Sequence, residues 1–389
     1  MKNLLKKNAI QFIILLGIAD LFADLTYEGA RSIMGPYLAL LGASATAVGV
    51  VAGLGELIGY SFRLVSGYLG EKTGRYWVFT LIGYIINMSA VPLLALAGRW
   101  EVAAALMIAE RFGKSIRSPL RDAMLSHAAQ AVGRGWGFGL HEAMDQIGAT
   151  MGPLVVAAVL FKNGSFAQGF AILAIPALLN LSTLLIARFR YPSPRDLETA
   201  PAPLQGEGLS RLYWIYLGGG ALVAAGYADF SLIAYHFQKK AILSANFIPI
   251  SYALAMGVDA LAALLFGLLF DRKGMGVMVA AVLSSLLFAP LVFLGGSGLA
   301  WLGMVLWGIG MGAQESILKA GVAALVPPNR RGSAYGIFST GFGVFWFLGS
   351  ALMGLLYDHS RNGLVIFSVA AQLAALPFFF WVARRANSQ

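Results

Sequence analysis

Long apolar runs dominate the sequence and constrain its fold more than any other feature. Twelve such runs are separated by charged clusters and by Gly, Pro or Asn. Because roughly 20 apolar residues in a helix cross the hydrocarbon core of a bilayer, each run predicts one transmembrane helix. The expected ranges are 10–40, 45–69, 76–97, 101–125, 133–160, 166–188, 211–238, 246–270, 275–295, 298–325, 332–357 and 363–383.

Composition agrees with a chain that lives in lipid. Hydrophobic residues make up 58% of the 389 positions and charged residues only 12%, whereas about a quarter of a typical soluble domain is charged. The runs are too long for a transmembrane β-barrel, whose strands alternate over about 10 residues. The 47 glycines suit closely packed helices. We therefore predict an all-α polytopic membrane protein in which lipid is the main surrounding, with no large extramembrane domain and no enzymatic activity.

A polar connector divides the twelve runs into six and six. The segment 190–210 contains four prolines and several charges, which indicates an exposed link. The predicted domains are 1–189, the connector 190–210, and 211–389. The basic start of the chain resembles a signal peptide, but the apolar run that follows is long and contains acids, so we expect it to remain as the first span.

Basic residues between the runs are distributed unevenly. If the N-terminus is cytoplasmic, seventeen Lys and Arg residues fall on the cytoplasmic side and five on the other. This bias predicts cytoplasmic termini in the cell (inner) membrane. The net charge of +10 is thereby explained without a nucleic-acid partner. The chain has no cysteine, and so it has no disulfide, thiolate nucleophile or Cys metal site.

Three short patterns recur at nearly one offset. The segment 67–75 recurs at 267–274, an offset of 200, and 134–139 recurs at 331–336, an offset of 197. The residues 22–25 are echoed by 227–230, an offset of 205. Three matches at almost the same spacing indicate duplication of a six-helix unit.

The first repeated loop carries a family resemblance. The chain resembles transporters of the major facilitator superfamily over its whole length, because the loop pattern G-x-L-x-D-R/K-x-G-R-R is matched in large part. Glu71 departs from the family's Asp, and Tyr76 replaces the final basic residue. The matching residues, including two in the second copy, are Gly67, Leu69, Glu71, Lys72, Gly74, Arg75, Asp271 and Arg272.

This resemblance implies two six-helix bundles that move a solute by alternating access. It also implies that the loop acid, Glu71, forms a conformation-dependent ion pair at the cytoplasmic end of span four, for which Arg121 is the expected partner. The alternative interpretation is that these charges only set topology.

Span five carries a second family pattern. The proton-antiporter motif G-x8-G-x3-G-P is matched by Gly139, Gly148, Gly152 and Pro153, but Val156 and Ala157 stand where the motif ends in glycines. By resemblance, this motif implies proton-coupled export. Ordinary small-residue packing against a neighbouring helix is the alternative.

Ionisable residues inside the spans are the candidate functional residues. A charge in the bilayer is costly unless it is paired or hydrated. At 100° per residue, four charged positions of span one (Asp20, Asp24, Glu28 and Arg31) fall within about 80° of one another. Four of span four (Glu110, Lys114, Arg117 and Arg121) fall within about 60°. The predicted cavity residues are Asp20, Asp24, Glu28, Arg31, Glu110, Arg111, Lys114, Arg117, Asp229, His236, Gln314, Glu315 and Lys319. In the resembled family, spans one, four, seven and ten line the central cavity.

These residues support three functional interpretations and one structural alternative. A membrane acid, Asp24 or Glu28, could carry a proton. Lys114, Arg117 and Arg111 could bind an anionic group. Asp20, Asp24, Glu28, Asp229 and His236 could bind a divalent cation that is exported. Alternatively, the charges only neutralise one another between helices. Asp20 is expected at the depth of Glu110 and Lys114, and His141 and Asp145 in span five are further buried groups without an assigned role.

Motifs of soluble chemistry are not found in the sequence. There is no G-x-x-x-x-G-K-[ST], so a primary ATP-driven pump is not expected, and there is no H-E-x-x-H. We expect no cofactor and no resident metal, and we expect a monomer whose partners are protons and a small-molecule or ion substrate. The sequence therefore predicts proton-coupled efflux of a small organic compound, with metal efflux and proton-coupled uptake of an organic anion as alternatives.

Overall fold

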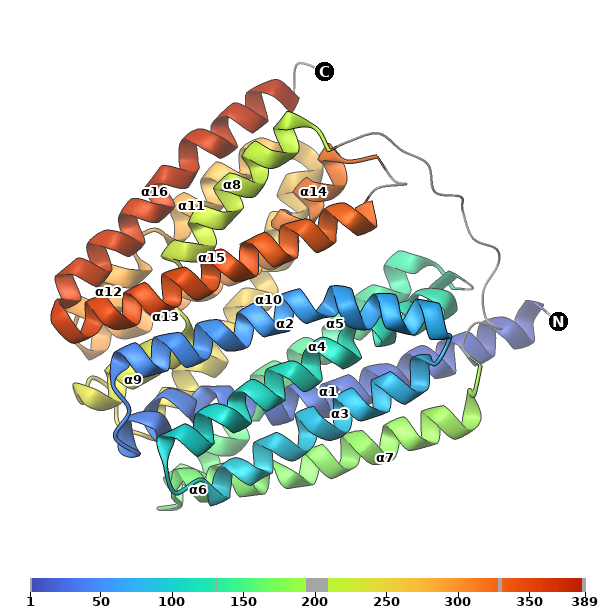
Figure 1. Cartoon of the computed structure of the whole chain (residues 1–389), viewed down its shortest axis with the longest axis horizontal. Coiled ribbons are helices and arrows are strands. Elements are labelled where there is room, and N and C mark those ends of the chain that lie inside the picture. Colours follow the sequence, from blue (N-terminus) through green and yellow to red (C-terminus); the bar gives the residue numbers. More distant parts are fainter. Residues whose placement is uncertain (1, 131, 194–208, 328–330, 387–389) are drawn as a thin grey trace. The chain divides into compact units, whose positions relative to one another are not determined.

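The described part of the chain folds into helices connected by short loops and turns (Figure 1). The computed structural model describes residues 2–130, 132–193, 209–327 and 331–386, and no strand occurs among them. Most of the predicted connector, residues 194–208, lies outside the described residues. The fold class predicted from the sequence, an all-α polytopic protein, is confirmed.

Twelve spans can be followed along the chain, in close agreement with the predicted ranges. Six are single helices: α1 (Lys2–Leu40), α2 (Ala45–Thr73), α4 (Trp100–Gln130), α5 (Arg134–Phe161), α10 (Phe247–Lys273) and α15 (Arg331–His359). The last span, α16 (Arg361–Ala386), is also continuous, and α3 (Tyr76–Leu93) ends in the short turn η1 (Leu94–Leu96). The other four spans are interrupted: α6 (Phe166–Ile172) with α7 (Ala174–Arg190), α8 (Arg211–Gly226) with α9 (Phe230–Lys239), α11 (Val277–Ser285) with α12 (Phe288–Leu294), and α13 (Ser297–Ala313) with η4 (Gln314–Leu318) and α14 (Lys319–Leu325).

Proline accounts for two of these interruptions. Pro176 and Pro290 lie near the start of α7 and α12. A proline ring clashes with the carbonyl four residues earlier in a helix. Those positions, 172 and 286, are where α6 ends and where α11 has just ended. The breaks are therefore local consequences of the sequence.

The break between α8 and α9 has a different cause. Asp229 caps α9 by accepting a hydrogen bond from the backbone N–H of Ser231 at 2.8 Å. The buried carbonyl of Ala228 accepts a hydrogen bond from Nε1 of Trp307 at 2.9 Å, and the hydroxyl of Tyr227 donates to the Trp307 carbonyl. Side chains therefore satisfy the backbone groups that the unwound turn leaves open.

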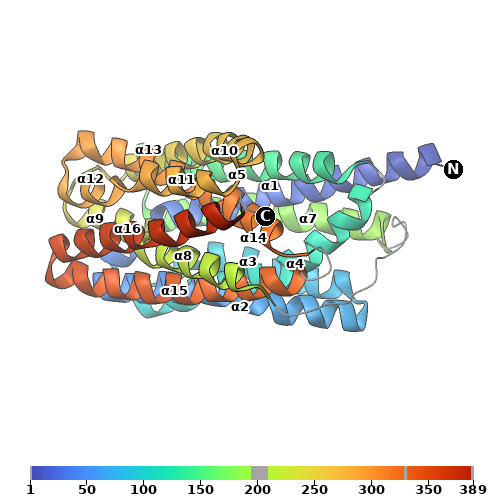
Figure 2. The ribbon, with the colours of Figure 1, turned by 90° about the horizontal axis from the view of Figure 1, so that it is seen from above.

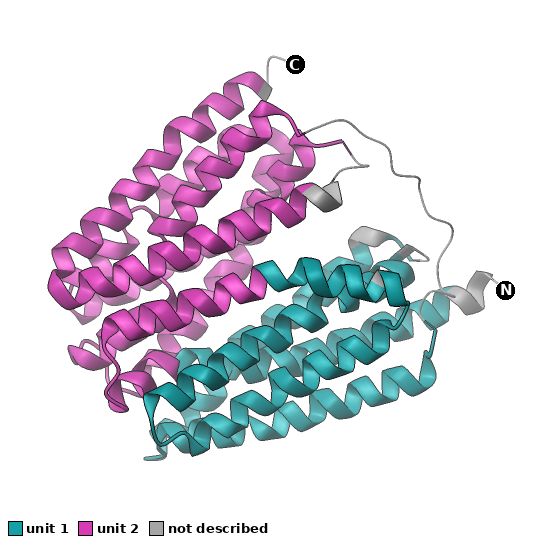
Figure 3. Ribbon diagram, viewed as in Figure 1, with its two compact units in different colours: residues 1–33, 61–202 teal, residues 34–60, 203–389 magenta. Residues whose placement is uncertain are grey.

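The described helices form two compact units, which are coloured teal and magenta in Figure 3. Unit 1 comprises residues 1–33 and 61–202, and unit 2 comprises residues 34–60 and 203–389. The end of α1 and most of α2 thus group with the C-terminal helices by their contacts. The domain division at 190–210 remains a prediction.

In unit 1, glycines allow two pairs of helices to touch. A Cβ atom on Gly148 or Gly152 of α5 would lie 2.3 Å from the carbonyl oxygen of Leu21 or Leu25 in α1. Gly83 of α3 and Gly113 of α4 face one another in the same way. The predicted close approach of span five is thus made on α1 by two of its glycines. A Cβ atom added to Gly139 would have no neighbour within 4 Å.

In unit 2, α8 packs against α15 and α16, and α10 runs beside α13 (Figure 2). Gly308 and Gly312 of α13 lie against the backbone of α10 at Ala255 and Asp259. The two loop repeats end alike, because Gly74 after α2 has φ +67° and Gly274 after α10 has φ +63°. This left-handed backbone favours glycine, which gives the repeated glycine a physical reason.

Nine stretches of the described helices are long and apolar enough to cross a membrane. One of them, Phe247–Leu294, is 48 residues long and contains two spans. The remaining spans are α4, which carries many charges, and the α13–α14 span, in which α13 alone has 17 residues. Large hydrophobic side chains are exposed along most helices, as expected for a surface that faces lipid.

Candidate functional site

The charged residues of α1 and α4 lie inside unit 1. Asp20, Asp24 and Glu28 of α1 are buried, as are Glu110 and Arg117 of α4. The 3.6-residue period of each helix places these side chains on one face, and the glycine contacts bring α5 and α3 against α1 and α4. A cluster of acids and bases therefore forms between four helices.

Asp20 is the centre of this cluster and is fully buried. Its carboxylate accepts hydrogen bonds from Nη1 of Arg117 at 2.9 Å and from the hydroxyl of Tyr84 in α3. Nη1 of Arg121 lies 2.7 Å from the same carboxylate, as does Nε2 of His141 in α5. Asp20 was expected at the depth of Glu110 and Lys114, but it meets α4 about two turns further along the helix.

His141 connects two carboxyl groups. Its Nε2 lies 2.7 Å from Oδ2 of Asp20, and its Nδ1 lies 3.3 Å from Oδ2 of Asp145. A neutral imidazole has one N–H and can donate to only one of them. A neutral histidine and two ionised carboxylates share one N–H proton between two contacts. Both contacts become hydrogen bonds when the three groups hold one additional proton. We call Asp20, His141 and Asp145 the proton triad, because the two contacts of His141 together require this additional proton.

Asp24 lies one turn after Asp20 in α1 and has different surroundings. Tyr27 donates a hydrogen bond to it. Asp20 and Asp145 are its nearby like charges, and Lys114 of α4 is its nearby opposite charge. The Nζ atom of Lys114 lies 3.8 Å from the centre of the Tyr27 ring. Asp24, which is buried, and Lys114, which is half-buried, are thus two opposite charges near each other beside the proton triad.

The other predicted charges of these two helices have partners of their own. Glu28 lies 3.9 Å from Arg31 in the same helix. Glu110 lies 3.4 Å from Arg111 and accepts a hydrogen bond from the amide of Asn87 in α3 at 2.8 Å. Each of these two ion pairs lies within one helix, and the neutral amide of Asn87 adds a hydrogen bond from α3 to α4.

In unit 2, Asp229 and His236 have separate surroundings. Asp229 caps α9, whereas Nδ1 of His236 lies 2.9 Å from the Tyr357 hydroxyl in a ring cluster that includes Phe293. Asp24 and Asp229 occupy equivalent positions of the sequence repeat but have different structural roles. Asp24 lies within a continuous helix, whereas Asp229 begins one.

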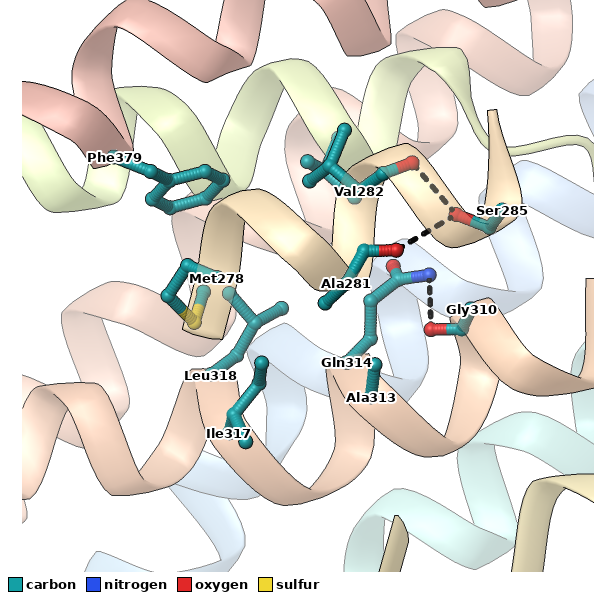
Figure 4. A pocket seen from close by; sticks show the side chains of 11 residues that line it. Met278, Ala281, Val282, Ser285, Gly310, Ala313, Gln314, Ile317, Leu318 and Phe379 are labelled. Carbon is teal, nitrogen blue, oxygen red and sulfur yellow. Dashed lines mark hydrogen bonds between the residues drawn. The ribbon is translucent and has the colours of Figure 1, made fainter. Parts of the chain in front are cut away.

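A small cavity of unit 2 contains Gln314 (Figure 4). It has room for roughly one water molecule and is lined mainly by apolar groups from α8, α11, α13, η4 and α16. The amide nitrogen of Gln314 donates to the carbonyl of Gly310 at 3.0 Å. Gln314 also begins η4, a π-helical segment, a distortion that is frequent at functional sites. Glu315 and Lys319 are exposed rather than part of this cavity.

Arg121 was predicted to pair with Glu71 of the repeated loop. The side chain of Glu71 lies outside the described residues, and the pair remains a prediction. Arg121 itself bonds Asp20, and it bonds Asp122 at 2.7 Å. The other predicted charged residues of the two repeated loops are exposed, namely Lys72, Arg75, Asp271 and Arg272.

The proton triad is also the one group of carboxylate and histidine ligands, among the described residues, whose atoms lie close enough for a metal ion. It does not fit a divalent cation, because both oxygens of Asp20 already face guanidinium groups of Arg117 and Arg121. A cation would have to displace these charges. The predicted metal set shares only Asp20 with this group.

Four polar residues of the cluster have no assigned role in the sequence prediction: Tyr84, Asn87, His141 and Asp145. A signal for two of them exists. His141 and Asp145 lie on the same helical face as Gly148 and Gly152, at intervals of four, three and four residues. Since those glycines are the residues that let α5 approach closely, the histidine on their face points to the same contact.

The fold and this buried cluster define a polytopic membrane transporter. The sequence profile described as Major Facilitator Superfamily matches residues 16–320, and the chain belongs to that family. It is 41% identical over 380 residues to an uncharacterized protein of Mycobacterium tuberculosis (strain ATCC 25618 / H37Rv), with 96% of this chain and 93% of that protein covered. It is 28% identical over 390 residues to an uncharacterized MFS-type transporter of Methanocaldococcus jannaschii, covering 95% and 94%.

Solved transporters share the fold. The nucleoside transporter NupG has a TM-score of 0.71 at 17% identity, covering 97% of this chain and 98% of that one. A bacterial homolog of the human lysosomal transporter Spinster, in an inward-facing and unoccupied conformation, has a TM-score of 0.74 at 14% identity, covering 98% of both chains. These likenesses establish the twelve-helix transporter fold.

Proposed function

We propose that the protein is a proton-coupled secondary transporter of a small organic solute, and that the proton triad carries the coupled proton. The observation that carries this proposal is the position of His141 between two carboxyl groups. Arg121 of α4 and Tyr84 of α3 also face the triad through Asp20. A change in its proton content therefore changes the ion pairs that join α1, α4 and α5. Such a change can bias one access state over another.

Asp24, one of the two acids predicted from the sequence together with Glu28, is the second candidate for the proton. Its neighbours are two acids and one lysine, so protonation would relieve repulsion and release Lys114. Variants of the two sites separate these possibilities.

The direction of transport is open to two proposals. Export of an organic compound follows from the glycine pattern of α5. Uptake of an organic anion follows from the cations of α4, which can bind an anionic group. A proton that moves with the anion would compensate its charge against a negative interior. For either direction, we propose that the protein lies in the cytoplasmic membrane with cytoplasmic termini, because the positive-inside bias supports this orientation.

The test is proton movement in proteoliposomes that contain a pH-sensitive dye. Compounds of a broad library are added at two pH gradients to vesicles with the wild type, His141→Gln or Asp24→Asn. We expect substrate-linked proton movement in the wild type and its loss in His141→Gln. Retained movement in His141→Gln with loss in Asp24→Asn would transfer the role to Asp24. Transport without any proton movement would contradict the proposal. Glu101→Gln, at an exposed position outside the cluster, is the matched control.

A further inference from the structure

One edge of the Arg117 guanidinium has no hydrogen-bond partner among the described residues. Nη1 donates to Asp20, whereas Nε and Nη2 are buried without an acceptor. In the planar guanidinium, the N–H of Nε and one N–H of Nη2 point in the same direction. Together they form the side-on fork that donates two parallel hydrogen bonds to the two oxygens of a carboxylate. The fork of Arg117, as we call this edge, is therefore a bidentate donor without an acceptor among the described residues.

Aromatic rings hold the fork of Arg117 in place. The guanidinium carbon lies 4.3 Å from the centre of the Tyr84 ring and 5.8 Å from that of Tyr27. The Arg117 backbone lies against Gly83 of α3, where an added Cβ would be 2.7 Å from its nitrogen. The side chain is 1% exposed. Because its position is fixed on three sides, the fork is pre-organised for a ligand, which limits the entropy lost on binding.

A second cation lies beside the fork. Lys114 is three residues before Arg117 in α4, and its Nζ lies over the same Tyr27 ring. The acids near Lys114 are Asp24 and Glu28 of α1. Two positive groups thus lie near one aromatic ring in a region where charges are poorly screened. An anion between them would reduce their mutual repulsion.

We propose that Arg117 and Lys114 bind the carboxylate of an organic anion, which is the transported solute. This inference rests on the proposed transport function and names its substrate class. In the state described here the fork is closed to solvent, so the anion enters when the helices rearrange during the transport cycle. The two unmet donors of the closed state favour that rearrangement, because an anion satisfies both.

The proton triad is linked to this anion site through Asp20. His141 is faced by Asp20 from α1, Asp145 from its own helix and Arg121 from α4. A proton added to the triad offsets negative charge next to Arg117 and makes the cluster more positive. Proton and anion therefore favour each other's binding. A proton and an anion that bind together cross the membrane in the same direction, which is cotransport. This coupling favours uptake of the anion over export.

The test is thermal unfolding of the full-length protein in detergent at fixed ionic strength in chloride. Benzoate and glutarate are compared with their neutral amides, benzamide and glutaramide, and with inorganic phosphate. We expect the carboxylates to raise the unfolding temperature, and more so at lower pH. Arg117→Lys keeps the charge but loses the fork, so the carboxylate affinity should fall about tenfold. Arg99→Lys, at an exposed position, should leave it unchanged.

Several results would overturn the proposal. The amides stabilising as well as the carboxylates, phosphate stabilising more than either carboxylate, or Arg117→Lys binding like the wild type would each do so. If Arg117→Lys does not fold, Lys114→Gln takes its place, because it leaves the Arg117–Asp20 pair intact and should also weaken carboxylate binding. Carboxylate binding without proton movement in vesicles would leave the site standing and remove the proton coupling. Proton movement driven only by neutral or cationic compounds would keep the proton coupling and overturn the carboxylate site.

Discussion

Replacing Asp20 by Asn should destabilise the protein more than any other single charge neutralisation in unit 1. The change is nearly isosteric but removes the negative charge that faces Arg117 and Arg121. Asp20 is fully buried, and the two arginine side chains are 1% and 13% exposed. Removing one partner of a buried ion pair costs about 3–5 kcal/mol, because the other charge stays buried and uncompensated.

Two control variants calibrate this figure. Asp122→Asn removes a carboxylate that lies at the same 2.7 Å from Arg121 but is 49% exposed. We expect less than about 1 kcal/mol there, since exposed pairs contribute little. Tyr84→Phe removes one neutral donor to Asp20 and should cost about 1 kcal/mol.

The assay is thermal unfolding of the purified variants in detergent, followed by tryptophan fluorescence. At roughly 2–4 °C for each kcal/mol, Asp20→Asn should lower the midpoint by on the order of 10 °C, and Asp122→Asn by only a few degrees. Equal shifts for Asp20→Asn and Asp122→Asn would refute the reasoning, because burial would then have no influence on the value of the pair.

Three further predictions concern packing and topology. Gly148→Ala should cost about 1–3 kcal/mol by overpacking α5 against the α1 backbone, whereas Gly139→Ala, where a Cβ meets nothing within 4 Å, should be neutral in the same unfolding assay. Trp307→Phe should cost about 1–3 kcal/mol, because the carbonyl at the α8/α9 break loses its donor; an unchanged midpoint would contradict this. Since the chain has no cysteine, Asn163→Cys should react with an impermeant thiol reagent in intact cells and Thr73→Cys should not, and the opposite pattern would invert the proposed topology.

The positions of the twelve spans could be predicted because the length of an apolar run and its flanking charges are local properties. The prediction places span five at 133–160, and α5 is Arg134–Phe161. The break at Tyr227–Asp229 could not be predicted in this way. It depends on Trp307, which is about 80 residues away in the sequence, and no proline marks it. The π-helix at Gln314 likewise has no sequence signal that we can identify.

The candidate site shows the same division between local and tertiary information. Helical periodicity alone places Asp20 on one face of α1 and Arg117 on one face of α4. It does not fix how far one helix is shifted along another, and so Asp20 was expected beside Lys114 and instead contacts Arg117 and Arg121. That shift is set by glycine contacts between the helices, which become visible only when the neighbours are known.

The central claim is that a proton and a carboxylate bind together to the cluster around Asp20. The most direct measurement is the number of protons taken up when benzoate binds the purified protein in weakly buffered detergent solution, followed with a pH-sensitive dye. The account predicts proton uptake on benzoate addition for the wild type and its loss in His141→Gln. Proton release, no change in pH, or the same uptake in His141→Gln would contradict it.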